Sequence, residues 1–231
     1  MSWLPGVHAA PNLQGDPALY EIENQALDPE GRITAAMRRI APWDDRVVVD
    51  LGSGTGFWAK VFEPAARHVV CVEPHAPSRL LAAQRIAREG WTRVDSLVGS
   101  APWIPLRDGC AHLVHARFAY FFGPGCEPGL AEVERVLAPG GTAIVIDNDL
   151  RTGTFAGWLE QVYPRDASAL DAFWTAQGFS KTPVRSCWRF QSREDLEAVV
   201  HLEFGQHAER LLAEHEGLEV DYGFVLFHRT H

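Results

Sequence analysis

The sequence predicts an α/β fold with a doubly wound, mostly parallel sheet, and three observations support this fold class. Short apolar runs alternate with helical patterns between residues 46 and 147, which is typical of parallel strands joined by helices. A glycine-rich turn follows the first apolar run directly. The 231 residues, of which 46% are hydrophobic and 22% charged, suffice for one globular domain with a full core. We therefore expect a single domain over residues 1–231.

The start of the chain has the composition of an arm. Pro, Gly and Asn are frequent in residues 1–27 and helical periodicity is weak, apart from one short helical pattern around 20–26. Asp28 and Pro29 are typical of an N-cap and the first residue of a helix. A helix is predicted to begin there and to end at Pro42.

The middle of the chain alternates between strands and helices. The predicted strands span 46–50, 68–73, 94–98, 111–117 and 142–147. The predicted helices between them span 56–66, 77–89 and 128–137. Gly90 stops the second of these helices. Strands connected in this way pair in parallel through right-handed crossovers.

The pattern weakens after residue 147. The predicted elements are a helical stretch over 154–177 that Pro164 interrupts, a strand over 183–190, a helix from 192 to about 216 and a final strand over 218–228. Ser192 and Asp195 resemble a capping box at the start of the last helix. Residues 151–217 are expected to lie on the side of the site that receives a second substrate.

The turn at residues 50–56 (DLGSGTG) indicates the class of ligand. Its glycines let the backbone approach a ligand closely. In a dinucleotide fold this turn faces a pyrophosphate, which Asp50 would repel, and the third glycine of G-x-G-x-x-G would fall on Phe57. An NAD-dependent oxidoreductase is therefore disfavoured. A ligand with positive charge and an adenosine, such as S-adenosylmethionine, suits the turn better.

Four segments in this order resemble the class I S-adenosylmethionine-dependent methyltransferases over residues 45–147. They are 50–56, 71–74 (CVEP), 99–106 (GSAPWIPL) and 135–141 (RVLAPGG), the last leading into a strand. The resemblance implies a Rossmann-like methyltransferase fold with a seven-stranded sheet whose last strand is antiparallel. It also implies that S-adenosylmethionine is the cofactor.

Ligands of such sheets bind at the carboxyl ends of the strands, and this rule with the resemblance yields the cofactor-binding candidates. These are Tyr20, Asp50, Gly52, Ser53, Gly54, Gly56, Glu73, Pro74, Ser100 and Ala101. Asp50 favours the cofactor's ammonium, and Glu73 can accept from both ribose hydroxyls. Ser100 stands where many relatives carry an acid that accepts from the adenine amino group. Tyr20 is expected to contact the cofactor from an arm that acts as a lid.

Arg117 and Asp149 are the candidate catalytic residues at the acceptor side. Arg117 ends the fourth strand and can hold an acidic group of the acceptor, or pair with Glu132 as structure. Asp149 can act as a general base, or serve the turn after the fifth strand. Two aromatic groups either wall an acceptor pocket or fill core. They are Phe118, Tyr120, Phe121 and Phe122 after the fourth strand, and Trp158, Trp174 and Trp188 later in the chain.

The composition of the chain restricts the kinds of molecule that it is expected to bind. The net charge of −9 and the lack of a basic run argue against nucleic acid. No apolar run approaches the ~18 residues of a membrane span, no secretory signal is evident, and the four cysteines are scattered. The spacing of the C-terminal histidines does not suggest a metal site. We expect a cytoplasmic enzyme that methylates a small-molecule acceptor. A catalytically silent, cofactor-binding regulatory module is the alternative, and the sequence predicts neither the acceptor nor the oligomeric state.

Overall fold

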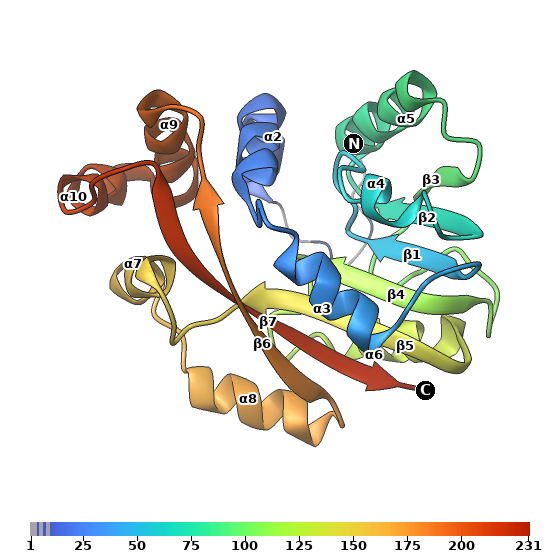
Figure 1. Cartoon of the computed structure of the whole chain (residues 1–231). Coiled ribbons are helices and arrows are strands. Elements are labelled where there is room, and N and C mark those ends of the chain that lie inside the picture. The colour runs from blue at the N-terminus through green and yellow to red at the C-terminus, as the bar shows by residue number, and fades with distance from the viewer. Residues whose placement is uncertain (1–3, 5–6, 8–9) are drawn as a thin grey trace.

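The computed structural model of the chain describes residues 4, 7 and 10–231 (Figure 1). The sheet has seven strands in the order β3-β2-β1-β4-β5-β7-β6. The strands are β1 (Val47–Leu51), β2 (His68–Glu73), β3 (Val94–Val98), β4 (Ala111–Arg117), β5 (Leu137–Asn148), β6 (Ser180–Arg189) and β7 (Glu219–Thr230). The first five pair in parallel, and β7 is antiparallel to both β5 and β6. The predicted sheet is confirmed.

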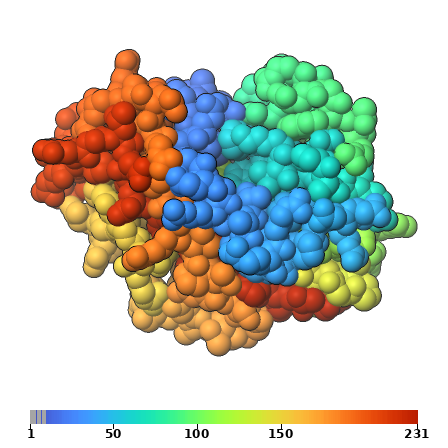
Figure 2. Space-filling view, in the orientation of Figure 1, coloured from blue at the N-terminus to red at the C-terminus, as the bar shows by residue number. Residues whose placement is uncertain are grey.

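The helices connect the strands and cover the sheet. They are α1 (Pro11–Gly15), α2 (Pro17–Ala26), α3 (Arg32–Ile40), α4 (Ala59–Phe62), α5 (Ala76–Glu89), α6 (Glu127–Val136), α7 (Thr154–Val162), α8 (Ala167–Ala176), α9 (Arg193–Phe204) and α10 (Ala208–Ala213), with the 3-10 turn η1 (Gly205–His207). One apolar core includes side chains of α3, α7 and α9, and a second includes side chains of α6 and α8. In the space-filling view, α2 lies between the C-terminal helices and the half of the molecule that contains α5 (Figure 2).

Several predicted boundaries are wrong, each for a local reason. The helix expected from Pro29 begins at Arg32 instead. Asp28 adopts a positive φ, and its carboxylate accepts hydrogen bonds from the Arg32 and Ile33 backbone amides at 3.0 and 2.8 Å. The helix expected over 56–66 is mostly turns and retains only the short α4. The pattern over 154–177 is two helices, the second capped by the Asp166 carboxylate.

The N-terminal arm folds into two short helices where one was expected. Its residues 1–3, 5–6 and 8–9 lie outside the described residues. Proline occupies the first turn of both α1 and α2, where its missing amide leaves no hydrogen bond unmade. The Asp16 side chain accepts from the Leu19 amide and caps α2. The arm is thereby positioned over the carboxyl ends of β1 and β4.

Among the described residues, no helix combines the length and the apolar composition that crossing a bilayer requires.

Candidate active site

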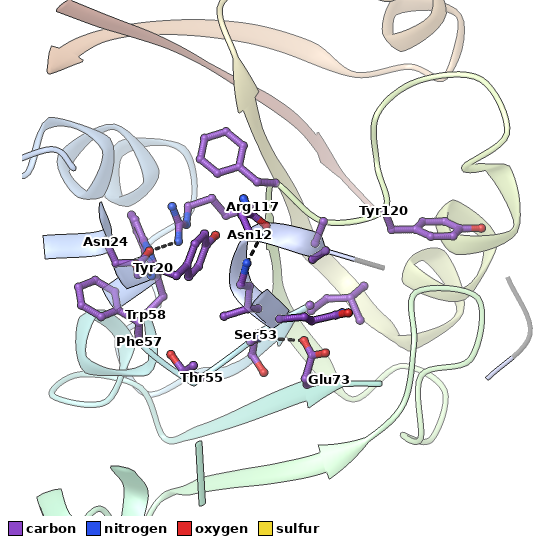
Figure 3. A pocket seen from close by; sticks show the side chains of 18 of the residues that line it. Asn12, Tyr20, Asn24, Ser53, Thr55, Phe57, Trp58, Glu73, Arg117 and Tyr120 are labelled. Atoms are coloured by element: carbon purple, nitrogen blue, oxygen red, sulfur yellow. Dashed lines mark hydrogen bonds between the residues drawn. The ribbon is translucent and has the colours of Figure 1, made fainter. Parts of the chain in front are cut away.

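A cavity of about 440 Å³ opens at the carboxyl ends of β1, β2 and β4. Its walls come from those strand ends, from α1 and α2 of the arm, and from later residues of α7, α9 and β7. The segments are distant in the sequence, but the parallel strands end at one edge of the sheet and the arm folds back over it. Figure 3 shows the side chains that meet there.

The glycine turn after β1 forms the floor of the cavity. Gly52 and Gly54 have φ angles of +73° and +55°, which L side chains rarely adopt. A Cβ on Gly52 would lie 2.4 Å from the Ala119 Cβ. The Gly52 amide donates to the Val72 carbonyl at 2.8 Å and ties the turn to β2. The turn therefore requires glycine on conformational and on steric grounds.

Polar atoms without partners surround this turn. Asp50 is buried, and its Oδ1 lies 2.8 Å from the Nδ1 of His115, a buried residue of β4. Asp50 Oδ2, Ser53 Oγ and Ser100 Oγ are buried and have no hydrogen-bond partner among the described residues. Unpaired buried polar groups are costly. Since all three residues line the cavity, their free atoms indicate where a polar ligand binds.

Glu73 joins the end of β2 to the glycine turn. Its Oε2 accepts from the Gly54 amide at 2.9 Å (Figure 3). Its Oε1 accepts from the His75 amide at the same distance of 2.9 Å. Burial raises the pKa of Glu73 above its ordinary value, although both amides oppose the shift. Each carboxylate oxygen retains acceptor capacity, so Glu73 can brace the turn and still accept from a pair of hydroxyls.

The structure brings together most of the residues predicted to bind the cofactor. Those that line the cavity are Tyr20, Asp50, Gly52, Ser53, Gly54, Glu73, Pro74, Ser100 and Ala101. Gly56 lies outside the lining, so its contact with the cofactor stays a prediction. Its amide donates to the Ser53 carbonyl, and a Cβ there would face Ala82 of α5 at 3.2 Å. Gly56 serves the close approach of α5 to the turn.

The two predicted catalytic residues have different surroundings. Arg117 lines the cavity, donates to the Asn24 side-chain oxygen, and lies 5.2 Å from the Trp58 ring centroid (Figure 3). The alternative pairing with Glu132 is wrong, because Glu132 binds Arg135 instead.

Asp149 lies outside the cavity lining. Its Oδ1 accepts from the Arg151 amide at 3.1 Å, as expected of a turn residue. The structure thus favours the turn role over the role of a general base, and we do not assign Asp149 to catalysis.

The aromatic candidates also separate into two groups. Phe118, Tyr120 and Phe122 line the cavity, whereas Phe121, Trp158, Trp174 and Trp188 are buried in the core and outside the lining. From the segment 151–217, the lining takes Phe155, Leu159 and Glu203.

Sequence reasoning missed a pair of acidic residues in the cavity, Glu23 of α2 and Glu203 of α9. Burial raises the pKa of both carboxyl groups. A signal was present for Glu203, because it follows the apolar positions 196, 199 and 200 at helical spacing and so stands on the face of α9 that packs inward.

Within the part of the chain that the structure describes, no three His, Cys, Asp or Glu side chains are grouped so that they could hold a metal ion.

The sheet order with antiparallel β7, the glycine turn after β1 and the acid that ends β2 define the class I S-adenosylmethionine-dependent methyltransferases. The resemblance to this family that the sequence predicted is confirmed over the matched part of the chain. A family model described as a methyltransferase domain matches residues 48–141.

Two curated relatives each match about half of the chain. The ubiquinone/menaquinone biosynthesis C-methyltransferase UbiE of Rubrivivax gelatinosus is 32% identical over 127 residues, which are 55% of this chain and 47% of that protein. The malonyl-[acyl-carrier protein] O-methyltransferase of Methylococcus capsulatus is 28% identical over 109 residues, 47% of this chain and 39% of that protein. The chain thus spans less than half the length of either relative.

Among solved structures, a putative methyltransferase from Bacillus halodurans is similar in fold, with a TM-score of 0.63, 19% identity, and coverage of 85% of this chain and 97% of that one.

Proposed function

We propose that this protein transfers a methyl group from S-adenosylmethionine to a small organic acceptor. The observation that carries the proposal is the set of buried, unpaired polar atoms of Asp50, Ser53 and Ser100 around a turn that only glycine can form. This set matches the polar groups of the cofactor, and the cavity extends beyond it toward the arm, α9 and β7.

The residues present fit the cofactor part by part. Glu73 would accept from the ribose hydroxyls, Asp50 would favour the ammonium, and Ser100 would accept from the adenine amino group. His115 holds the Asp50 carboxylate in place through Oδ1 and leaves Oδ2 for the ligand. When bound, S-adenosylmethionine supplies a methyl group activated by its sulfonium.

The protein itself would contribute to the reaction by aligning the two reactants and by shielding them from water. Alignment of two reactants can lower a barrier by several kcal/mol. The arm encloses the cavity, since Leu13 packs against Gly54 and the Asn12 side chain donates to Glu203 at 2.6 Å. The aromatic residues that follow Arg117 in the chain, Phe118, Tyr120 and Phe122, line the cavity and would contact the acceptor.

The small acceptor is inferred from the enclosed cavity and from charge. A net charge of −9 opposes binding of a polyanion. One of the two relatives is named as a C-methyltransferase and the other as an O-methyltransferase, so the methyl group goes to carbon in one and to oxygen in the other. We therefore propose the acceptor class without the methylated atom.

Ligand binding and turnover test the proposal in two steps. S-adenosylhomocysteine at a hundredfold excess over Kd should stabilise the protein by about 2.7 kcal/mol, which for a chain of this size raises Tm by roughly 5–10 °C. NAD should not. Methyl transfer is then screened with a library of small acceptors. A shift with NAD alone would contradict the cofactor, and binding without transfer to any acceptor would favour the silent module.

A further inference from the structure

A second polar cluster lies in the cavity, between the arm and the C-terminal helices. Glu23 is only 7% exposed, and its Oε2 has no hydrogen-bond partner among the described residues. Glu203, which is less buried, approaches from α9 and accepts from Asn12 through Oε1. Two carboxyl groups thus meet inside a ligand cavity, one of them with a free oxygen.

Few groups of positive charge balance this pair. The titratable and charged side chains that act on it are Tyr20 of α2, Arg117 of β4 and Tyr222 of β7. Arg117 is the only arginine or lysine in the lining among the described residues, and Asn24 already engages it. Burial and the charge of Glu203 raise the pKa of Glu23, and burial raises that of Glu203, so both carboxyl groups hold a proton more readily than an exposed glutamate does.

This cluster and the glycine turn have different charged neighbours. The charges that affect Glu23 are those of Glu203 and Arg117, whereas the charges that affect Glu73 are those of Arg79 and Asp50. The cavity therefore has two polar ends. The end at Asp50 and Glu73 fits the cofactor, which leaves the pair of glutamates to face the other reactant.

Aromatic side chains flank the end of the cavity that contains Glu23 and Glu203. Phe155 stacks on Tyr222 with centroids 3.8 Å apart, and Phe118 stacks on the same ring at 6.5 Å. All three residues line the cavity. Phe155 and Phe224 both stack on Tyr222, so these rings provide an apolar wall, which accommodates an apolar part of a ligand, while the carboxylates attract a cation.

We propose that Glu23 and Glu203 bind a protonated amine of the methyl acceptor, so that the acceptor is a cationic amine with an apolar, ring-bearing body. This inference deepens the proposed function and rests on it. The positive charge of the amine compensates the charge of the ionised pair, so the amine competes with the protons that the raised pKa values favour. An anionic acceptor would add negative charge beside two carboxyl groups that face one arginine.

A matched set of probes tests the proposal: phenethylamine, phenethyl alcohol and hydrocinnamate. Each is titrated calorimetrically into the full-length protein, with and without S-adenosylhomocysteine. The amine should bind at least about tenfold more tightly than the alcohol, a difference of about 1.4 kcal/mol. Its affinity should increase from about pH 5 to about pH 8, and binding should release a proton, detected as a dependence of the heat on buffer ionisation enthalpy.

Variants identify the groups responsible. Glu23→Gln should abolish the preference for the amine and the proton release, while the Kd of S-adenosylhomocysteine stays within about twofold, well below one tenfold step in affinity. Glu203→Gln should act in the same direction. Glu160→Gln, an exposed acid of α7, is the matched control and should bind the amine as the wild type does.

Two results would overturn the inference. One is equal binding of amine and alcohol by the wild type. The other is a Glu23→Gln variant that loses S-adenosylhomocysteine and retains the amine preference, because the pair would then hold the cofactor. Absence of S-adenosylhomocysteine binding to the wild type would instead contradict the proposed function, and the amine preference would still be measured without it.

Discussion

Replacing Glu73 by alanine should have two effects that can be measured independently: it should lower the stability of the free protein and weaken cofactor binding. In the free protein, the change removes the acceptor of the buried Gly54 amide and that of the partly buried His75 amide. An unsatisfied buried donor costs about 1–3 kcal/mol, which lowers Tm by roughly 2–12 °C for a chain of this length. Thermal denaturation without ligand measures this loss. Glu160→Ala, at an exposed position, should leave Tm unchanged.

The effect on affinity has its own control. Hydrogen bonds to a charged group contribute about 1.5–3 kcal/mol, so Glu73→Ala should weaken S-adenosylhomocysteine binding about ten- to a hundredfold. An analogue of S-adenosylhomocysteine without the two ribose hydroxyls should bind the wild type more weakly than S-adenosylhomocysteine does. The Kd of this analogue should change little when Glu73 is replaced by alanine, because the hydroxyls that Glu73 binds are already absent. If the losses from the variant and from the analogue simply add, Glu73 does not contact the ribose and the reasoning is refuted.

Three further changes have defined outcomes. Gly52→Ala should destabilise the protein by more than Gly90→Ala, because both residues have positive φ but only Gly52 faces a neighbouring side chain; equal Tm losses, each near the ~1 kcal/mol of backbone strain alone, would contradict the steric argument. Burial raises the pKa of Glu23 in the folded state, so the free energy of unfolding should fall as pH rises from the pKa of the unfolded carboxyl group to that of the folded one. Tm measured against pH should show this fall, and Glu23→Gln should reduce it. Asn12→Ala removes the bond from α1 to Glu203 and should accelerate proteolysis within the arm, with S-adenosylhomocysteine protecting the wild type more than the variant.

The strand ends could be predicted because local sequence specifies them. Three predicted strands, β2, β3 and β4, have the observed boundaries, since short apolar runs between turn residues have one place to begin and end. The proposed cofactor half of the site follows from this, because Asp50, Glu73 and Ser100 lie in or within two residues of strand ends at one edge of a parallel sheet.

The acceptor half could not be predicted in this way. Glu23, Glu203 and Tyr222 meet only through the packing of α2, α9 and β7, and no spacing along the chain indicates that contact. The sequence left two roles open for Asp149 for a related reason. A carboxylate one residue after a strand can serve the site or the turn, and here its bond to the Arg151 amide determines the turn role.

The two halves of the cavity differ in what a substitution can change. The glycine turn, Glu73 and the Asp50–His115 pair are bound to the backbone of β1, β2 and β4, so altering them perturbs the sheet as well as the ligand. Glu23 and Glu203 are held mainly by helix packing and by side chains of the arm. Exchanging the acids on α2 and α9 should therefore alter which acceptor binds at little cost to the fold. Arg117, at the end of β4, donates to Asn24 of α2 and so joins a strand end to the arm.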